Sequence, residues 1–130
     1  MEQIGSVLKQ RGGVERFKGF AKPNTTPTPD DIFDVFLTQL THAELKVLLY
    51  IVRRTFGFKK QADRISLKQI TEGVVRRSGV RLDAGAGVNR RTAQRVVQRL
   101  ERRGLITVQR VRTADGYNQV NTYALRFRQG

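Results

Sequence analysis

The sequence predicts a mainly helical domain that carries a small β-hairpin, an α+β fold. Two capping-box patterns, at Thr41 and Ser66, mark the starts of helices, and apolar residues recur at three- and four-residue steps after them. Near the C-terminus, Asp115–Gly116 is a hairpin signal between two segments with the composition of β-strands. The 130 residues suit one domain with a modest core, plus an arm.

Residues 1–29 are expected to form a basic N-terminal arm that contains proline and threonine. Three prolines lie in its last seven residues, and each restricts the backbone of the residue before it. Two interpretations stay open: an arm that follows a groove or crosses a partner, and a disordered terminus. Phe17 and Phe20 favour docking of the arm on the domain's own surface. The domain itself is expected to span residues 30–130.

The first two helices are expected to build the core. Residues 30–40 are predicted as a helix because proline and acidic residues are favourable at a helix start. Its inward-facing residues are expected to be Ile32, Phe33, Phe36, Leu37 and Leu40. Residues 41–56 are predicted as the central helix, with Thr41 and Glu44 as a capping box. Its inward-facing residues are expected to be Leu45, Leu48, Leu49, Val52 and Phe56, with Val47 and Ile51 beside them.

A short strand is predicted at residues 63–65, and a third helix follows it. Ser66 and Gln69 form the capping box of that helix, and its inward-facing residues are expected to be Leu67, Ile70 and Val74. Residues 75–87 contain three glycines and are expected to be a flexible connection. The segment lacks the Gly-Lys-Ser/Thr sequence of a phosphate-binding loop.

The next helix is predicted to have one apolar face and one basic face. Asn89 is its expected N-cap, and Gly104 supplies the left-handed residue that ends it. The apolar stripe consists of Ala93, Val96, Val97 and Leu100. The opposite face consists of Arg91, Gln94, Arg95, Gln98, Arg99 and Arg102. Because this short helix has six arginines and a single acid, Glu101, we expect it to lie on a polyanion.

Residues 105–112 and 121–128 are predicted as the two strands of the hairpin, with the turn at residues 113–117. The expected order is therefore helix, helix, short strand, helix, basic helix and hairpin. This is the order of a winged helix-turn-helix domain. In such a domain the last helix enters the major groove of DNA, and its N-terminal residues lie deepest.

The net charge of the chain is +14, and more than half of it lies in the last third. Residues 88–130 hold ten basic and two acidic residues, which is +8. This asymmetry favours a polyanionic partner, although charge alone does not identify DNA. The chain has no cysteine, so disulfides and thiolate zinc sites are excluded. It shows no signal peptide and no apolar run that could span a bilayer, and we expect a protein of the bacterial or phage-infected cytoplasm without membrane contact.

Two sets of DNA-binding residues follow from the winged-helix expectation. The candidates for contacts to base edges are Asn89, Arg90, Arg91, Thr92, Gln94 and Arg95. The candidates for contacts to phosphate are Gln98, Arg99, Arg102, Arg103, Arg76, Arg77, Arg110 and Arg112. The hairpin tip, residues 113–118, is expected at the neighbouring minor groove or backbone. Two alternatives stay open: an ordinary amphipathic surface helix, and a plain sheet edge that Arg110 and Arg112 merely protect.

Residues 28–128 resemble the N-terminal domain of the phage lambda-type replication protein O family, a winged-helix module that binds replication origins. The more specific matching parts are Arg53 to Phe58, RRTFGF, and Asp63 to Leu67, DRISL. The resemblance implies that the recognition helix covers residues 89–99. It also implies a further C-terminal segment that contacts the helicase machinery, and the chain ends after the expected hairpin. The 75–87 segment is longer than the usual three- or four-residue turn between the two DNA-facing helices.

The expected function is sequence-specific binding of double-stranded DNA in a phage- or plasmid-type replication initiator. The alternatives are a winged-helix transcriptional repressor and a non-specific nucleic-acid-binding or interaction module. No enzyme activity, cofactor or metal is expected, because His42 has no partner acid or nucleophile and the acids at residues 30–34 suit a helix start. Expected partners are double-stranded DNA, a second copy on repeated or palindromic sites, and the replication machinery. The sequence leaves open the target sequence, the oligomeric state and the roles of the arm and the 75–87 segment.

Overall fold

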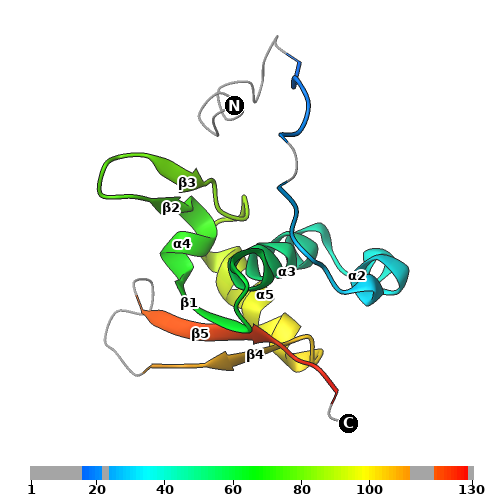
Figure 1. Ribbon diagram of the computed structural model, residues 1–130. Coiled ribbons are helices and arrows are strands. Elements are labelled where there is room, and N and C mark those ends of the chain that lie inside the picture. The colour runs from blue at the N-terminus through cyan, green and yellow to red at the C-terminus, as the bar shows by residue number, and fades with distance from the viewer. Residues whose placement is uncertain (1–15, 22–23, 112–118, 129–130) are drawn as a thin grey trace.

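The computed structural model describes residues 16–21, 24–111 and 119–128, and these form a mixed helix-and-strand fold (Figure 1). The two longest helices, α3 and α5, cross in the middle, with a sheet on one side of them and a smaller hairpin on the other. Within these residues, the elements are α2 (Asp30–Asp34), the 3-10 helix η1 (Phe36–Thr38), α3 (His42–Thr55), the 3-10 helix η2 (Phe56–Phe58), β1 (Ala62–Ser66), α4 (Leu67–Glu72), β2 (Val74–Val75), β3 (Arg81–Asp83), α5 (Arg90–Arg102), β4 (Ile106–Gln109) and β5 (Val120–Leu125).

Helix α3 is the centre of the core, and its predicted capping box is confirmed. The Glu44 backbone N–H donates to Thr41 Oγ1 at 3.1 Å, and the Thr41 N–H donates to Glu44 Oε1 at 2.8 Å. The residues with at most 1% exposure on this helix include Val47, Leu48, Ile51 and Val52. The expected inward position of Leu49 is wrong, since this side chain is 37% exposed. Tyr50 is buried instead, because its hydroxyl reaches a partner on β3.

The helix predicted at residues 30–40 is shorter than expected. Helix α2 ends at Asp34, Val35 leaves the helical region, and η1 continues as a tighter turn. Only one row faces the core: Ile32, Phe36 and Leu40 are four residues apart and are buried or partly buried. The expected burial of Phe33 and Leu37 is wrong, because these residues lie one position further round and are 53% and 48% exposed.

The predicted hairpin is confirmed and belongs to a larger sheet. In the described part of the chain, this sheet has the order β1-β5-β4, and all its strands are antiparallel to their neighbours. The short strand expected at residues 63–65 pairs with β5, where Asp63 lies opposite Tyr123. Tyr123 faces the core with 1% exposure. The predicted turn and hairpin tip, residues 113–118, lie outside the described residues.

The flexible connection expected at residues 75–87 is wrong, because this segment contains an ordered hairpin. Strand β2 pairs with β3 directly after α4. The Tyr50 hydroxyl donates to Asp83 Oδ1 at 3.1 Å and ties the hairpin to α3. Gly73 starts the hairpin with a φ of +87°, and a Cβ here would collide with the Asp83 carbonyl. Val74, expected to face inward on a helix, therefore lies on β2.

Within the described part of the arm, residues 16–21 are exposed, whereas Thr26, Thr28 and Pro29 are partly buried. The rings of Phe17 and Phe20 meet edge to face at 4.9 Å between centroids. Phe20 is 92% exposed, so its expected docking on the domain surface is wrong. Nearer the domain, Thr26 lies beside Gly57 at the end of α3.

Candidate nucleic-acid interface

Helix α5 begins where the sequence predicts. Asn89 is the N-cap, and its Oδ1 accepts a hydrogen bond from the Thr92 N–H at 2.8 Å. No acid lies in the first turn, whereas Arg99 and Arg102 lie in the last turn, at the negative end of the helix dipole. Asn89 Oδ1 is engaged as the acceptor of the cap, and the side-chain amide nitrogen can donate to a base. Thr92 is half-buried, so it is less accessible than the arginines beside it.

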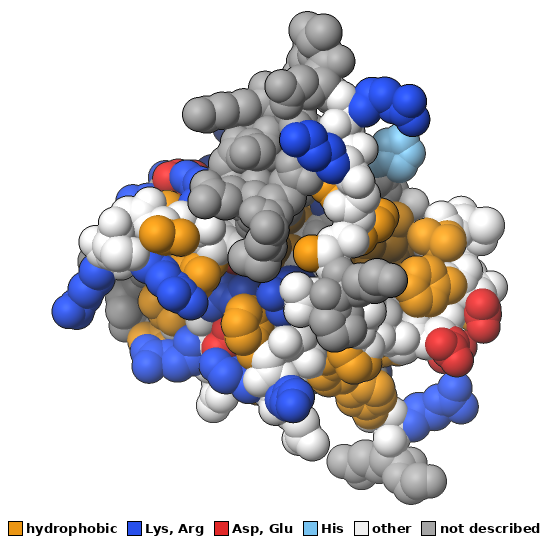
Figure 2. Space-filling view, turned by 45° about the horizontal axis from the view of Figure 1, so that its top comes forward, with side chains coloured by type: hydrophobic (Ala, Val, Ile, Leu, Met, Phe, Trp, Pro, Cys, Tyr) orange, Lys and Arg blue, Asp and Glu red, His pale blue; other side chains and the backbone are white. Residues whose placement is uncertain are grey.

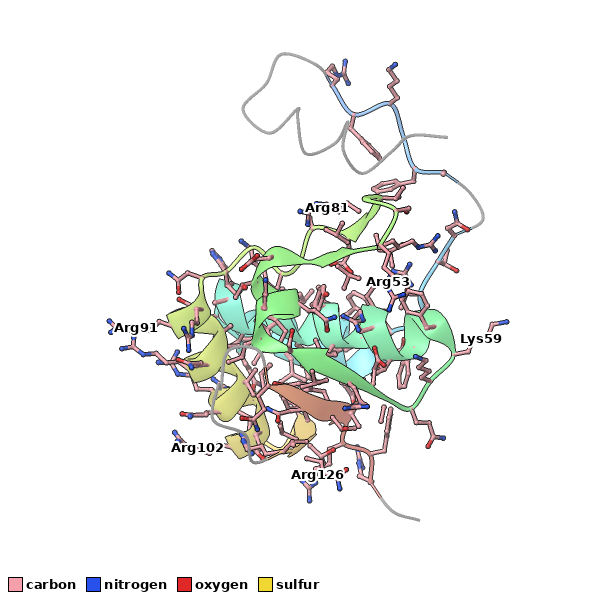
Figure 3. All side chains as sticks on the ribbon, turned by 90° about the vertical axis from the view of Figure 1, so that its left-hand side faces the viewer. Arg53, Lys59, Arg81, Arg91, Arg102 and Arg126 are labelled. Atoms are coloured by element: carbon pink, nitrogen blue, oxygen red, sulfur yellow. The ribbon has the colours of Figure 1, made fainter. Side chains whose placement is uncertain are left out.

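The apolar stripe of α5 packs on the central helix α3, as expected, and also on α4. Its residues Ala93, Val96, Val97 and Leu100 are all at most 5% exposed. Packing on two helices fixes the rotation of α5 about its own axis. The other face consequently points to solvent, and Arg91, Gln94, Arg95, Gln98, Arg99 and Arg102 are all exposed. Figure 3 shows Arg91 and Arg102 projecting from α5 away from the body of the domain.

The end of α5 is fixed by Gly104, which has the expected left-handed conformation with a φ of +81°. The Leu105 N–H donates to the Leu100 carbonyl at 3.0 Å, and the Gly104 N–H donates to the Glu101 carbonyl at 3.0 Å. These two bonds form a Schellman motif, which satisfies the last carbonyls of the helix. Strand β4 starts two residues later, so the position of the sheet relative to α5 is set by this turn.

Two of the predicted phosphate contacts have acidic partners inside the chain. Arg103 Nε lies 3.2 Å from Glu44 Oε2, and Arg110 binds both carboxylate oxygens of Glu101, at 2.9 and 3.1 Å. Burial opposes the charged form of Glu44, yet the Thr41 N–H and the Arg103 guanidinium lower its pKa below the ordinary value. The hydrogen bonds from Arg110 lower the pKa of Glu101. The negative charge of the single acid on α5 is therefore balanced by Arg110.

A groove of about 280 Å³ runs between α5 and the sheet. Gln94 and Gln98 line it from the helix, and Arg110 and Asn121 line it from the strands. Sequence reasoning missed Asn121, whose Oδ1 accepts from the Val111 N–H at 3.1 Å and holds the two strands together beyond the last ladder pair. No local pattern identifies this role, because it depends on the register of β4 against β5.

Two further predicted phosphate contacts, Arg76 and Arg77, lie in the β2–β3 segment and not on α5. Arg76 lines a cleft beside Arg53 and Phe58, at the end of α3. Arg77 is exposed in the turn between β2 and β3. Arg112 lies outside the described residues. The structure therefore groups the α5 residues with Arg110, and places Arg76 in different surroundings.

Other kinds of site are not apparent in the residues that the structure describes. Among them, no three side chains of His, Cys, Asp or Glu lie close enough to hold a metal ion. No helix formed by these residues has the length and apolar character needed to cross a membrane.

Comparison with known protein families identifies one that matches this chain. The family model described as bacteriophage replication protein O matches residues 26–123, which run from just before α2 to β5 and include all of α5. No curated protein and no solved structure matches the chain. Because the match covers most of the chain, the protein belongs to the bacteriophage replication protein O family and has a role in phage DNA replication.

Proposed function

We propose that this chain is a winged-helix domain that binds double-stranded DNA sequence-specifically at a replication origin. The observation that carries the proposal is the exposed face of α5: four arginines and two glutamines without an exposed unpaired acid. In this interpretation α4 and α5 form the helix-turn-helix, and the β4–β5 hairpin is the wing. The domain acts by binding and not by catalysis, in the cytoplasm of the infected host.

In this interpretation, the exposed face of α5 has two parts. A major groove about 12 Å wide admits one helix, with its N-terminal turns deepest. Arg91, Gln94 and Arg95 project from those turns and are suited to bidentate bonds with guanine or adenine. Arg99 and Arg102, one to two turns later, are suited to phosphates. Arg90 and the Asn89 amide are also in the deep part, next to the helix start.

The experiment that tests this proposal is a selection from random double-stranded DNA at moderate salt. Wild type is compared with Arg91→Ala, Arg95→Ala and Arg102→Ala. We expect a defined motif for wild type, relaxed preference at one or two positions for either of the first two variants, and uniformly weaker binding for the third. If no motif emerges, or if all three variants only weaken binding, α5 contacts phosphate alone.

Salt dependence gives a second measurement of the same proposal. Contacts to about four to eight phosphates predict a slope of roughly −4 to −7 in log affinity against log salt concentration. Fluorescence anisotropy with a labelled duplex measures this slope. A flat response would exclude the arginines of α5 as the main source of affinity.

A further inference from the structure

A cleft lies at the end of α3, away from α5. It has a volume of about 420 Å³ and is enclosed by α3, β1 and the β2–β3 hairpin. Its floor is a closed polar network: Arg54 binds Asp63 at 2.9 Å and donates to the Tyr50 hydroxyl at 3.1 Å, which in turn donates to Asp83. Since these groups satisfy one another, the floor is structural.

The rim of this cleft combines cations with apolar side chains. Arg53 lies over the ring of Phe58, with its guanidinium carbon 4.6 Å from the centroid, and Arg76 approaches from the hairpin. Among the described residues, neither arginine has a carboxylate within 4.0 Å. Phe58 and Leu82 are 49% and 39% exposed. The rim therefore suits a partner that offers both carboxylates and an apolar side chain.

The cleft does not share a side of the domain with the proposed DNA surface. In Figure 3, Arg91 and Arg102 project on one side, and Arg53 and Lys59 lie on the opposite side. A straight duplex along α5 would leave the cleft open. This favours a protein surface as the occupant over the same DNA.

A surface of matching chemistry exists on α2 of the same chain. Asp30, Phe33 and Asp34 lie on α2 and Leu37 lies on η1, outside the row that faces the core; we call these four residues the α2 face. All four are exposed, and no basic side chain of the described residues lies within 4.0 Å of either acid. Figure 2 shows carboxylates beside hydrophobic side chains at the edge of the molecule where α2 lies.

We propose that the α2 face of one copy docks into the α3–hairpin cleft of a second copy. Asp30 and Asp34 would meet Arg53 and Arg76, and Phe33 would enter between Phe58 and Leu82. The two surfaces differ and lie on separate parts of the domain, so the contact is head to tail and leaves one of each surface free. Such a contact can extend from copy to copy. If α5 binds repeated DNA sites, as proposed above, neighbouring sites would raise the effective concentration for this contact.

The test uses the protein without DNA, so that it does not depend on DNA binding. Sedimentation velocity over a concentration series, up to about 1 mM to detect weak association, compares wild type with two charge-reversed variants. These are Asp30→Lys/Asp34→Lys on α2 and Arg53→Glu/Arg76→Glu in the cleft. Arg77→Glu is the matched control, because it makes the same change one residue away without lining the cleft. Circular dichroism verifies that every variant is folded.

We expect each double variant to weaken self-association at least about tenfold, and the control to change it little. The two double variants mixed together should associate again, because the intact α2 face of one fits the intact cleft of the other, and the two reversed surfaces also carry opposite charges. Three results would overturn the proposal. They are a wild type that stays monomeric, a mixture of the two double variants that does not associate, and a cleft variant that loses self-association while the α2 variant keeps it. A separate titration with a duplex that holds one binding site tests the other occupant: a cleft variant that keeps wild-type self-association but loses affinity for this duplex would assign the cleft to phosphate and overturn the proposal.

Discussion

The ion pair between Glu44 and Arg103 gives the sharpest test of how α5 is held. Glu44 is 2% exposed and serves two roles: its Oε1 completes the capping box of α3, and its Oε2 accepts from Arg103 at the end of α5. Glu44→Gln keeps an acceptor for the Thr41 N–H but removes the charge. Glu44→Ala removes both the acceptor and the charge. Comparison of the two variants therefore separates the cap from the ion pair.

The expected losses follow from these contacts. The cap is worth about 1 kcal/mol. The ion pair is worth about 1 kcal/mol, because the Arg103 side chain is 40% exposed and solvent screens its charge. We expect Glu44→Gln to lower the free energy of unfolding by about 1 kcal/mol and Glu44→Ala by about 2 kcal/mol. In thermal denaturation, each kcal/mol corresponds to a Tm shift of roughly 4–8 °C for a domain of this size.

A double-mutant cycle with Arg103→Met measures the pair directly. We expect a coupling free energy of about 1 kcal/mol between Glu44 and Arg103 at neutral pH. The pKa of Glu44 is lower in the folded protein than its ordinary value. The charge of Glu44 therefore stabilises the fold at pH values above the ordinary pKa. The contribution is lost as the pH falls through the folded pKa. Zero coupling at neutral pH, or equal stability of Glu44→Gln and Glu44→Ala, would refute this account of the α3–α5 contact.

Three further predictions concern the hairpins and the charge of α5. Gly73→Ala should cost well over 1 kcal/mol in thermal unfolding, because its Cβ meets backbone, whereas Gly79→Ala, with a similar positive φ but open space, should cost about 1 kcal/mol. Burial raises the pKa of Tyr50 to about 12, so Tyr50→Phe should remove the tyrosine that ionises near that pH in an ultraviolet titration. Glu101→Gln should free Arg110 and steepen the salt slope of DNA binding by about 1; an unchanged slope would show that Arg110 does not reach phosphate.

The sequence was most informative where a feature is local. Both capping boxes and the glycine end of α5 depend on residues within five positions of one another, and all three are confirmed. The ordered hairpin of β2 and β3 could not be predicted. The hydrogen bond that ties it to α3 joins Tyr50 and Asp83, which are 33 positions apart. The partner of Arg103 lies 59 positions away. For the same reason, the exposed face of α5 could be predicted from its periodicity, but the ion pairs at its edge could not.

The arginine row on α5 has an electrostatic cost that the fold alone does not require. Arg91, Arg95 and Arg99 are spaced four residues apart, and Arg102 follows at three, so each meets a like charge on the same face. Like charges at this spacing cost about 0.2–0.5 kcal/mol per pair, or on the order of 1 kcal/mol for the row. Burial of the opposite stripe outweighs this, since each of its larger side chains contributes about 1.5–3 kcal/mol. The helix thus folds despite the repulsion between its arginines. DNA phosphates would relieve this repulsion. We therefore expect bound DNA to stabilise α5 by more than the free energy of the individual arginine–phosphate contacts.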